Sequence, residues 1–527
     1  MADDPNNAGT RRPDDDLADH AEDLTAASVS GGVWRGASTF GGAALQFGVS
    51  IVLARLLTPA DFGTVTLVAV VVGIANMLAF LGVGPALVRR KTLTPDYVAT
   101  AWTLSVIGGV LGCAVIALLA PLLARLVGDA STSIVFVVVS PILVLTGLRT
   151  CSMSLLRREM RFRELMVVDL LSYGLGYCLV AVATALLGWG VWALVAGMLS
   201  QGIIACIVAF AYERHTVKLR LARSATREIL DFGGGVTASG LANYVALNAD
   251  NFIIGRTLGT GAVGLYNRAY MLMNLPVTYG ALVLSQVLLP AFSRAQDDRE
   301  RVSRGYLASL YLVFTVATPM LMFVLVAAPY LIRTLFGPQW EASIAPLQVF
   351  AIFGAFRAAY HLGTAVAQAL GKPWREFLRQ LLYAVVVVAG ALIGYRWGIV
   401  GVAWGTSLAI MVMYVLIAQL SHSLLGFSWR SFARAHATGL VCGLLVLAVG
   451  AAASYGLRGQ QWSDLAMLVC LAVACIATAL VAVSLLPRTW RVDGAERAMS
   501  VALGMLPWRL STPLIKVLRI PAPAAQE

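Results

Sequence analysis

The feature that most constrains this chain is a series of apolar runs, each long enough to cross a lipid bilayer as one helix. A hydrocarbon core about 30 Å thick needs about 20 residues at a rise of about 1.5 Å each. Hydrophobic residues make up 59% of the 527-residue chain and charged residues 13%, which excludes an ordinary soluble enzyme. The predicted fold class is an all-α polytopic membrane protein with about 14 transmembrane helices. The predicted helices are 33–55, 64–88, 98–124, 133–156, 166–187, 191–212, 229–254, 262–290, 306–335, 343–370, 377–395, 399–424, 436–456 and 464–486.

Basic residues are distributed unequally between the two sides that these helices define. Segments on one side, which include both tails, hold 28 Lys and Arg, whereas the loops on the other side hold six. By the positive-inside rule, we expect an even number of helices and two cytoplasmic termini. The formal net charge of +12 therefore reflects membrane topology, and nucleic-acid binding is not its explanation.

The segments outside the predicted helices are short or polar. Residues 1–32 are acidic, lack the basic and apolar regions of a signal peptide, and are expected to form a disordered cytoplasmic tail. Residues 487–527 are expected to form a basic cytoplasmic tail. The loops on the far side are too short to fold as a catalytic domain, so the chain is not expected to be an enzyme. Seven cysteines lie in apolar runs without a Cys-x-x-Cys pair, and no disulfide, metal site or cofactor is predicted.

An internal repeat divides the chain. With a shift of 201 residues, 55–63 overlays 256–264, with Arg, Leu and Gly at equal spacing, and weaker matches follow in the same order. The repeat predicts two six-helix lobes related by a pseudo-two-fold axis along the membrane normal, with the substrate between the lobes. Duplication for stability alone is the alternative. The predicted parts are an N-lobe at 33–212, a basic inter-lobe linker at 213–228, a C-lobe at 229–424 and two further helices at 436–486.

Charged and polar residues inside the predicted helices are the candidate functional residues. A charge at the centre of a membrane helix costs about 2.5–3.5 kcal/mol, so it normally faces a cavity or a partner. Arg357, His361 and Gln368 follow helical spacing, which places them in one polar stripe on an apolar helix. The predicted substrate-binding residues are Arg35, Gln46, Arg149, Asn243, Asn248, Tyr266, Arg268, Tyr270, Asn274, Arg357, His361 and Gln368. The predicted ion-coupling residues are Asp169 and Asp250, for coupling to H⁺ or Na⁺, with His361 third.

Structural roles remain open for several of these residues. Arg35 lies near a helix end, from which its guanidinium could reach the interface. Asp250 could pair with Arg256 or Arg268 to hold two helices together, and Asp169 could cap a helix or pair with a loop residue. His361 could be an ordinary core histidine.

Three segments resemble one known family. Residues 54–63, Ala-Arg-Leu-Leu-Thr-Pro-Ala-Asp-Phe-Gly, resemble a signature of polysaccharide-transporter flippases (Wzx and WzxC-like), which belong to the multidrug/oligosaccharidyl-lipid/polysaccharide exporter superfamily. Residues 250–259 with 264–269, and residues 155–162, resemble the same family. The resemblance covers about residues 30–485.

The resemblance implies a two-lobe flippase of the bacterial inner membrane. It would move an undecaprenyl-pyrophosphate-linked oligosaccharide, the repeat unit of an exopolysaccharide, O-antigen or capsule, from the cytoplasmic to the periplasmic leaflet by alternating access. Arg149, Arg268 and Arg357 would then neutralise the pyrophosphate, because the guanidinium binds phosphate through two parallel hydrogen bonds. The implied partners are the lipid-linked oligosaccharide and membrane lipids, with a polysaccharide polymerase and other assembly proteins as further candidates.

Other functions predict different features. A multidrug antiporter of the same superfamily would have an acid-rich lumen, whereas the embedded charges here are mostly arginine. A glycan polymerase would carry a large periplasmic loop, and a lipid-linked glycosyltransferase a cytoplasmic Asp-rich metal site. A scaffold of the assembly machinery without transport activity would have its polar stripes packed shut.

Overall fold

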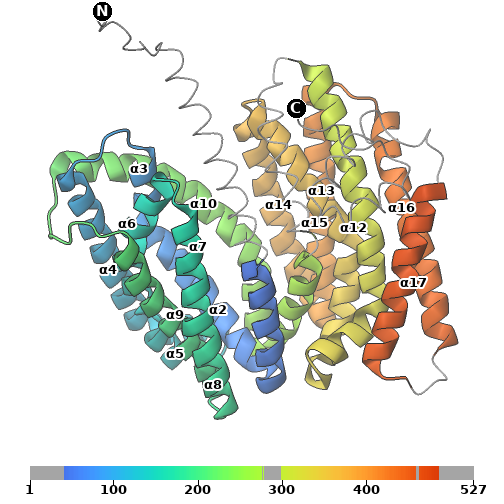
Figure 1. The fold of residues 1–527 in the computed structure, drawn as a ribbon, viewed down its shortest axis with the longest axis horizontal. Helices are drawn as coiled ribbons and strands as arrows, with labels where there is room; N and C mark the ends of the chain where they lie inside the picture. The colour runs from blue at the N-terminus through green and yellow to red at the C-terminus, as the bar shows by residue number, and fades with distance from the viewer. Residues whose placement is uncertain (1–40, 276, 278–297, 458–461, 486–527) are drawn as a thin grey trace, which may run out of the picture. The chain divides into compact units, whose positions relative to one another are not determined.

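The structure is a computed structural model that describes residues 41–275, 277, 298–457 and 462–485 (Figure 1). These residues are helical or in short connections, and no strand occurs among them. Ten of their helical segments are long and apolar enough to cross a membrane. All fourteen predicted ranges overlap helix in the described residues, so the predicted all-α membrane fold is confirmed.

The helices have the following bounds. The first part of the chain contains Gly41–Leu56, α2 (Pro59–Phe80), α3 (Val83–Arg89), α4 (Pro95–Val127), α5 (Thr132–Val139), α6 (Ile142–Arg158), α7 (Phe162–Leu171), the π-helical η1 (Ser172–Leu179), α8 (Val180–Leu186), α9 (Val191–Tyr212) and α10 (Arg223–Leu258). The second part contains a helix at 260–275, α12 (Arg299–Leu335), η2 (Pro338–Ser343), α13 (Ile344–Ala369), α14 (Pro373–Gly394), η3 (Tyr395–Trp397), α15 (Gly398–Leu425), α16 (Trp429–Gly456) and α17 (Asp464–Leu485).

Local sequence explains where the helices depart from the simple prediction. The helix predicted at 133–156 is divided into α5 and α6 at Ser140–Pro141, because proline cannot donate the hydrogen bond that would continue α5. The predicted linker at 213–228 is irregular only over 213–222, since α10 already begins at Arg223. The predicted tails, 1–32 and 487–527, lie outside the described residues, as do residues 33–40 of the first predicted helix and residue 486 of the last.

The described chain forms two compact units. Unit 1 holds the described residues up to Leu56 together with Val71–Ala120 and Ile134–Leu241, and unit 2 holds Leu57–Val70, Pro121–Ser133 and the chain from Ala242 onward. Helices α2, α4, α5 and α10 each contribute residues to both units. The lobe boundaries predicted from the sequence stay a prediction.

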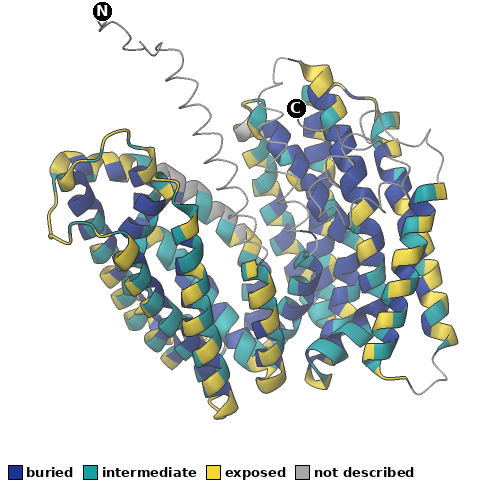
Figure 2. Ribbon diagram, in the orientation of Figure 1, coloured by how far each residue is buried: buried dark blue, intermediate teal, exposed yellow. Residues whose placement is uncertain are grey.

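Each unit is a bundle around a few central helices. In unit 1, α9 packs against α6, η1 and α8, while α3 packs against α6. In unit 2, α12 packs against α13, α16 and α17, and α15 packs against α13 and α14. Buried positions are dense along α12 and α13 (Figure 2), which therefore form the centre of unit 2.

The segment Thr58–Gly63 fixes the start of α2. The Thr58 hydroxyl and backbone N–H both donate to Asp61 Oδ2, at 2.7 and 2.9 Å, and the Asp61 N–H donates to Thr58 Oγ1 at 3.3 Å. This reciprocal pair satisfies N–H groups that a helix start leaves free, and Pro59 suits the first helical position because it has no N–H. The Thr58–Asp61 part of the signature sequence is therefore a helix cap.

Gly63 lets α2 meet the helix at 260–275 backbone to backbone. A Cβ at Gly63 would lie 1.7 Å from the Thr260 carbonyl oxygen, and a Cβ at Gly264 would lie 1.9 Å from the Pro59 carbonyl oxygen. The 201-residue repeat relates Gly63 to Gly264 and Pro59 to Thr260. The two repeated segments thus contact each other through equivalent positions, as expected around a two-fold axis.

We predict that Gly63→Ala destabilises the protein by about 1–3 kcal/mol, because the added methyl group collides with a backbone carbonyl that cannot rotate away. Gly261→Ala is the matched control, since nothing lies within 4 Å of its Cβ position and alanine favours the helix. The check is the melting temperature of the two purified variants in one detergent. Equal melting temperatures would contradict the close contact.

Candidate functional site

A buried carboxylate occupies the interior of unit 2. Asp250 on α10 is 5% exposed. Its Oδ2 accepts a hydrogen bond of 2.7 Å from the Tyr266 hydroxyl, and its Oδ1 accepts one of 2.8 Å from the Asn251 backbone N–H. Gly259, with φ of +88°, ends α10 and lets the chain turn directly into the helix at 260–275 that carries Tyr266. The tight corner between these two helices therefore brings Tyr266 to Asp250.

Tyr266 links this carboxylate to α15. Its oxygen lies 3.0 Å from Thr406 Oγ1, and both residues are buried. Because the single hydroxyl proton of Tyr266 is given to the carboxylate, Tyr266 accepts the proton of Thr406. Asp250, Tyr266 and Thr406 thus form a hydrogen-bonded chain across three helices.

A second polar group lies beside this chain. The rings of Tyr266 and Tyr270 are nearly parallel at 6.4 Å between centroids, and the Phe350 ring stands edge-on to both, at 5.2 and 5.3 Å. Arg357 on α13 lies over the Tyr270 ring, with 5.1 Å between guanidinium carbon and centroid, and its Nε donates to Asn274 Oδ1 at 3.1 Å. The aromatic rings connect the carboxylate and the arginine into one site.

Arg357 keeps an unused donor in this site. The side chain is 8% exposed, and its Nη1 is buried without a hydrogen-bond partner in the described part of the chain. No carboxylate oxygen of the described residues lies within 4.0 Å of the Arg357 nitrogens, and the salt bridges that are present involve other residues. A buried cation with a free N–H is suited to an anionic group from a ligand.

Arg268 has a different environment, although the sequence predicted the same role for it. Its guanidinium carbon lies 4.2 Å from the Phe62 ring centroid, 4.8 Å from that of Phe336 and 4.9 Å from that of Trp340. Three rings thus enclose the buried cation, an arrangement that is stabilising when the cation is desolvated. Phe62 belongs to the signature segment, so its contact with Arg268 joins the start of α2 to the interior of unit 2.

Of the other residues predicted on α10, Asn248 is partly buried, as is its neighbour Tyr244. Tyr244 donates to the Ala69 carbonyl at 3.3 Å, and the Asn248 amide donates to the Tyr244 carbonyl at 2.8 Å. The side chain of Asn243 lies outside the described residues. Tyr244 therefore contacts α2, Asn248 contacts the backbone of its own helix, and neither hydrogen bond involves Asp250 or Arg357.

The polar stripe predicted on α13 is divided between two environments. Arg357 is buried, whereas His361 and Gln368 are exposed. The His361 ring lies 4.3 Å from the Tyr360 ring, and Gln368 donates to Glu376 Oε2 at 3.4 Å. Of this stripe, the structure brings only Arg357 into contact with Tyr270 and Asn274.

The predicted residues of unit 1 do not form a comparable cluster. Arg149 on α6 is partly buried and interacts electrostatically with Asp169 on α7, which is exposed. The described part of unit 1 contains no salt bridge of 4.0 Å or less between them. Gln46 is exposed, and Arg35 lies outside the described residues.

Three residues of the site were missed in the sequence. Thr406 and Phe350 occur in ordinary apolar helices, where nothing distinguishes them from lipid-facing or core positions. Asn267, whose Nδ2 donates to Asn251 Oδ1 at 2.6 Å, lies next to Arg268 in the segment that resembles the flippase family. The sequence feature that could have identified Asn267 is its polar side chain inside a predicted membrane helix.

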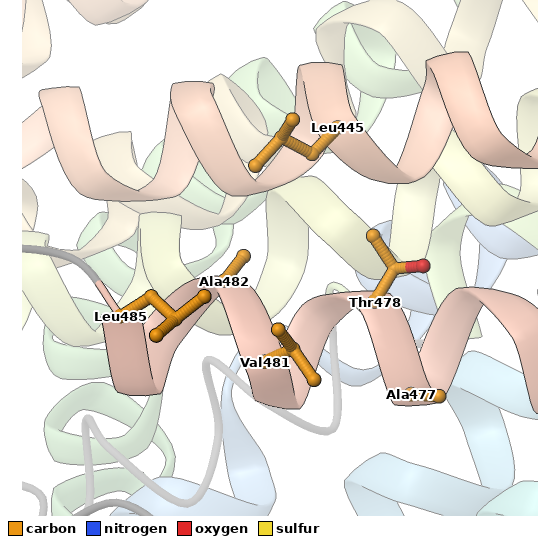
Figure 3. A pocket seen from close by; sticks show the side chains of 6 residues that line it. All are labelled: Leu445, Ala477, Thr478, Val481, Ala482 and Leu485. Atoms are coloured by element: carbon orange, nitrogen blue, oxygen red, sulfur yellow. The ribbon is translucent and has the colours of Figure 1, made fainter.

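Two other kinds of site, a metal centre and an apolar groove, are not part of the cluster around Asp250 and Arg357 in the described residues. In the residues that the structure describes, no group of three or more His, Cys, Asp or Glu side chains could hold a metal ion. The groove lies between α16 and α17 and is lined by aliphatic side chains and Thr478 (Figure 3), whose hydroxyl donates to the Ala474 carbonyl at 2.7 Å. The lining residues are Leu445, Ala477, Thr478, Val481, Ala482 and Leu485.

Known proteins share both sequence and fold with this chain. It is 22% identical over 444 residues to the lipopolysaccharide biosynthesis protein WzxC of Escherichia coli, covering 82% of this chain and 89% of WzxC. It is 25% identical over 417 residues to the succinoglycan biosynthesis transport protein ExoT of Rhizobium meliloti, covering 78% and 81%. The fold resembles that of the lipid II flippase MurJ in an inward closed conformation, with a TM-score of 0.70, 12% identity, and coverage of 86% of this chain and 98% of MurJ.

The family match covers more than half of the chain. It extends over residues 52–345, which include the signature segment at the start of α2, the helix with Asp250 and the helix with Tyr266 and Arg268. The chain belongs to the polysaccharide biosynthesis protein family.

Proposed function

We propose that this protein is a flippase for an oligosaccharide carried on undecaprenyl pyrophosphate, moving it from the cytoplasmic to the periplasmic leaflet of the bacterial inner membrane. The family membership and the names of WzxC and ExoT support a role in polysaccharide biosynthesis. The likeness to MurJ supports a fold that is compatible with moving a lipid-linked sugar. In this proposal both termini are cytoplasmic, and the repeat unit belongs to an exopolysaccharide, O-antigen or capsule.

The observation that carries the proposal is the buried Arg357 with an unused N–H inside a membrane-spanning helix. A pyrophosphate offers oxygens that accept from a guanidinium more strongly than neutral acceptors do. Tyr270 and Asn274, which contact Arg357, add hydrogen-bonding groups suited to sugar hydroxyls. Transport requires no covalent step, so we assign no catalytic residue.

Asp250 is our candidate for coupling transport to an ion gradient. Its carboxylate is buried, and no cationic side chain of the described residues lies within 4.0 Å of it. An unpaired buried carboxylate is costly unless it takes up a proton or holds a cation. A carboxylate that changes its occupancy as the protein changes conformation links H⁺ or Na⁺ to transport. Asp169 is the weaker candidate, because it is exposed.

Removal of the protein is the direct test of the flippase proposal. We expect the lipid-linked repeat unit to accumulate on the cytoplasmic leaflet of cells that lack the gene, since its synthesis continues while its export stops. Its sidedness is measured with a membrane-impermeant lectin or glycosidase on spheroplasts and inverted vesicles. If the lipid-linked repeat unit reached the outer leaflet at the normal rate, the flippase function would be excluded.

Of the two buried arginines of unit 2, Arg357 should mainly affect transport and Arg268 should mainly affect stability. We predict that Arg357→Gln lowers transport at least about tenfold with little change in melting temperature, because it removes a charged donor worth about 1.5–3 kcal/mol to an anionic ligand. Arg268→Gln should instead lower the stability of the protein by about 1–2 kcal/mol, because it removes the cation from three aromatic rings. Transport by the purified protein in vesicles and its melting temperature are both measured. Normal transport by Arg357→Gln would remove this residue from the substrate site.

We predict that Asp250→Asn abolishes gradient-dependent transport while the protein still inserts into the membrane at normal abundance. The amide keeps the shape of the side chain and an oxygen for Tyr266, but cannot bind a proton or compensate a cation. Asp231→Asn on the same helix is the matched control, since Asp231 is exposed and pairs with Arg227. Equal stimulation of both variants by an imposed H⁺ or Na⁺ gradient would rule out coupling through Asp250.

A further inference from the structure

The irregular segment Glu213–Ala222 of unit 1 is held firmly to neighbouring helices. Thr103 Oγ1 on α4, which donates its proton to the Ala99 carbonyl at 2.7 Å, accepts from the Arg220 N–H at 3.0 Å, and Thr100 Oγ1 accepts from the Ala222 N–H at 3.1 Å. The bonded backbone groups thus belong to every second residue, as in an extended strand that lies along a helix. One edge of the segment is therefore fixed to α4.

The first part of this segment is anchored by side chains. Ser152 Oγ donates to the Glu213 carbonyl at 2.9 Å, and the Arg161 guanidinium donates to Glu213 Oε2 at 2.8 Å. Burial, followed by the charge of Glu159, raises the pKa of Glu213, although Arg161 opposes this shift. His215 lies against the rings of Phe210 and Trp102, at 5.5 and 6.3 Å, and burial lowers its pKa, so its ring is neutral at pH 7.

This fixed segment carries an amphipathic pattern with a period of two. Val217, Leu219 and Leu221 alternate with the basic Lys218 and Arg220. The three aliphatic side chains are 52%, 74% and 55% exposed, and Arg220 forms an ion pair with Asp96 on α4. Since alternate side chains of an extended segment point to opposite sides, one face is apolar and the other is basic. We call residues 217–221 the amphipathic strip.

We infer that the amphipathic strip lies in the interface of the membrane and binds its lipids, with its apolar face among the acyl chains and its basic face at the phosphate groups. The strip connects the end of one membrane helix, α9, to the start of α10, which places it at interfacial depth. Three neighbouring aliphatic side chains exposed to water would be unfavourable, whereas cations beside them complement anionic lipid headgroups. The flanking Arg214 and Arg223 are exposed and extend the basic side.

Cysteine accessibility tests this inference. Val217→Cys, Leu219→Cys and Leu221→Cys are compared with the matched control Lys218→Cys in the full-length protein, within nanodiscs of phosphatidylcholine and phosphatidylglycerol that leave both membrane faces open. None of the seven native cysteines is exposed, so labelling of the parent protein is a usable background. We expect the apolar positions to react with a charged maleimide at least about fivefold more slowly than position 218, because a thiolate must form in water. Equal rates would overturn the inference.

A second measurement separates lipid from protein as the cover. A bimane fluorophore is attached in detergent to Leu219→Cys or Lys218→Cys, and the protein is then reconstituted with lipids whose acyl chains carry bromine. We expect bromine to quench the fluorophore at position 219 more than at position 218. Slow labelling at position 219 without preferential quenching would mean that a protein segment covers the strip, and this result would overturn the inference. Labelling is also measured in native membrane fragments, and slow labelling that occurs there but not in nanodiscs would overturn the inference too.

Discussion

The cost of burying polar groups in an apolar bundle governs the arrangement of unit 2. A buried polar group without a partner is destabilising, and inside a membrane there is little water to supply one. Asp250, Tyr266 and Thr406 meet this requirement by hydrogen bonding across three helices, and Arg268 does so by contact with three aromatic rings. Arg357 leaves one N–H unused beside them. Buried hydroxyls such as that of Ser407 also lack a partner among the described residues, but Arg357 differs from them because its unused donor is charged. An unused charged donor is expected where an anionic ligand binds.

The signature segment connects the fold to this site. Thr58 and Asp61 cap α2, Phe62 contacts Arg268, and Gly63 allows the close approach to Thr260. The contact at Gly264 lies only two residues before Tyr266, so the backbone that carries the Asp250 hydrogen bond is positioned by the same crossing of helices. One short segment therefore serves as a helix cap, a packing contact and a support for the buried site. These three roles explain physically why Thr, Asp, Phe and Gly occur at this spacing in the signature segment.

The sequence predicted the membrane helices far better than the site. Length and hydropathy determine where a helix can cross a bilayer, so 191–212 was predicted with the bounds that α9 has. Side-chain partners depend on how distant helices pack, and the sequence holds no direct record of this. Helical spacing placed Arg357 and His361 on one stripe, but α13 buries the first and exposes the second. Thr406 could not be predicted, because its role depends only on a hydroxyl that faces Tyr266 from another helix.

The amphipathic strip and the buried carboxylate are linked by one continuous helix. Helix α10 begins at Arg223, directly after the segment that is fixed to α4, and extends without a break to Leu258, carrying Asp250 in its last third. A strip held by lipid would restrain the start of this helix at the membrane surface, while Tyr266 and Asn267 on the next helix hold its far end by hydrogen bonds to Asp250 and Asn251. A change of proton or cation at Asp250 would alter only the far end. The strip and the buried carboxylate are therefore joined by one hydrogen-bonded backbone, that of α10.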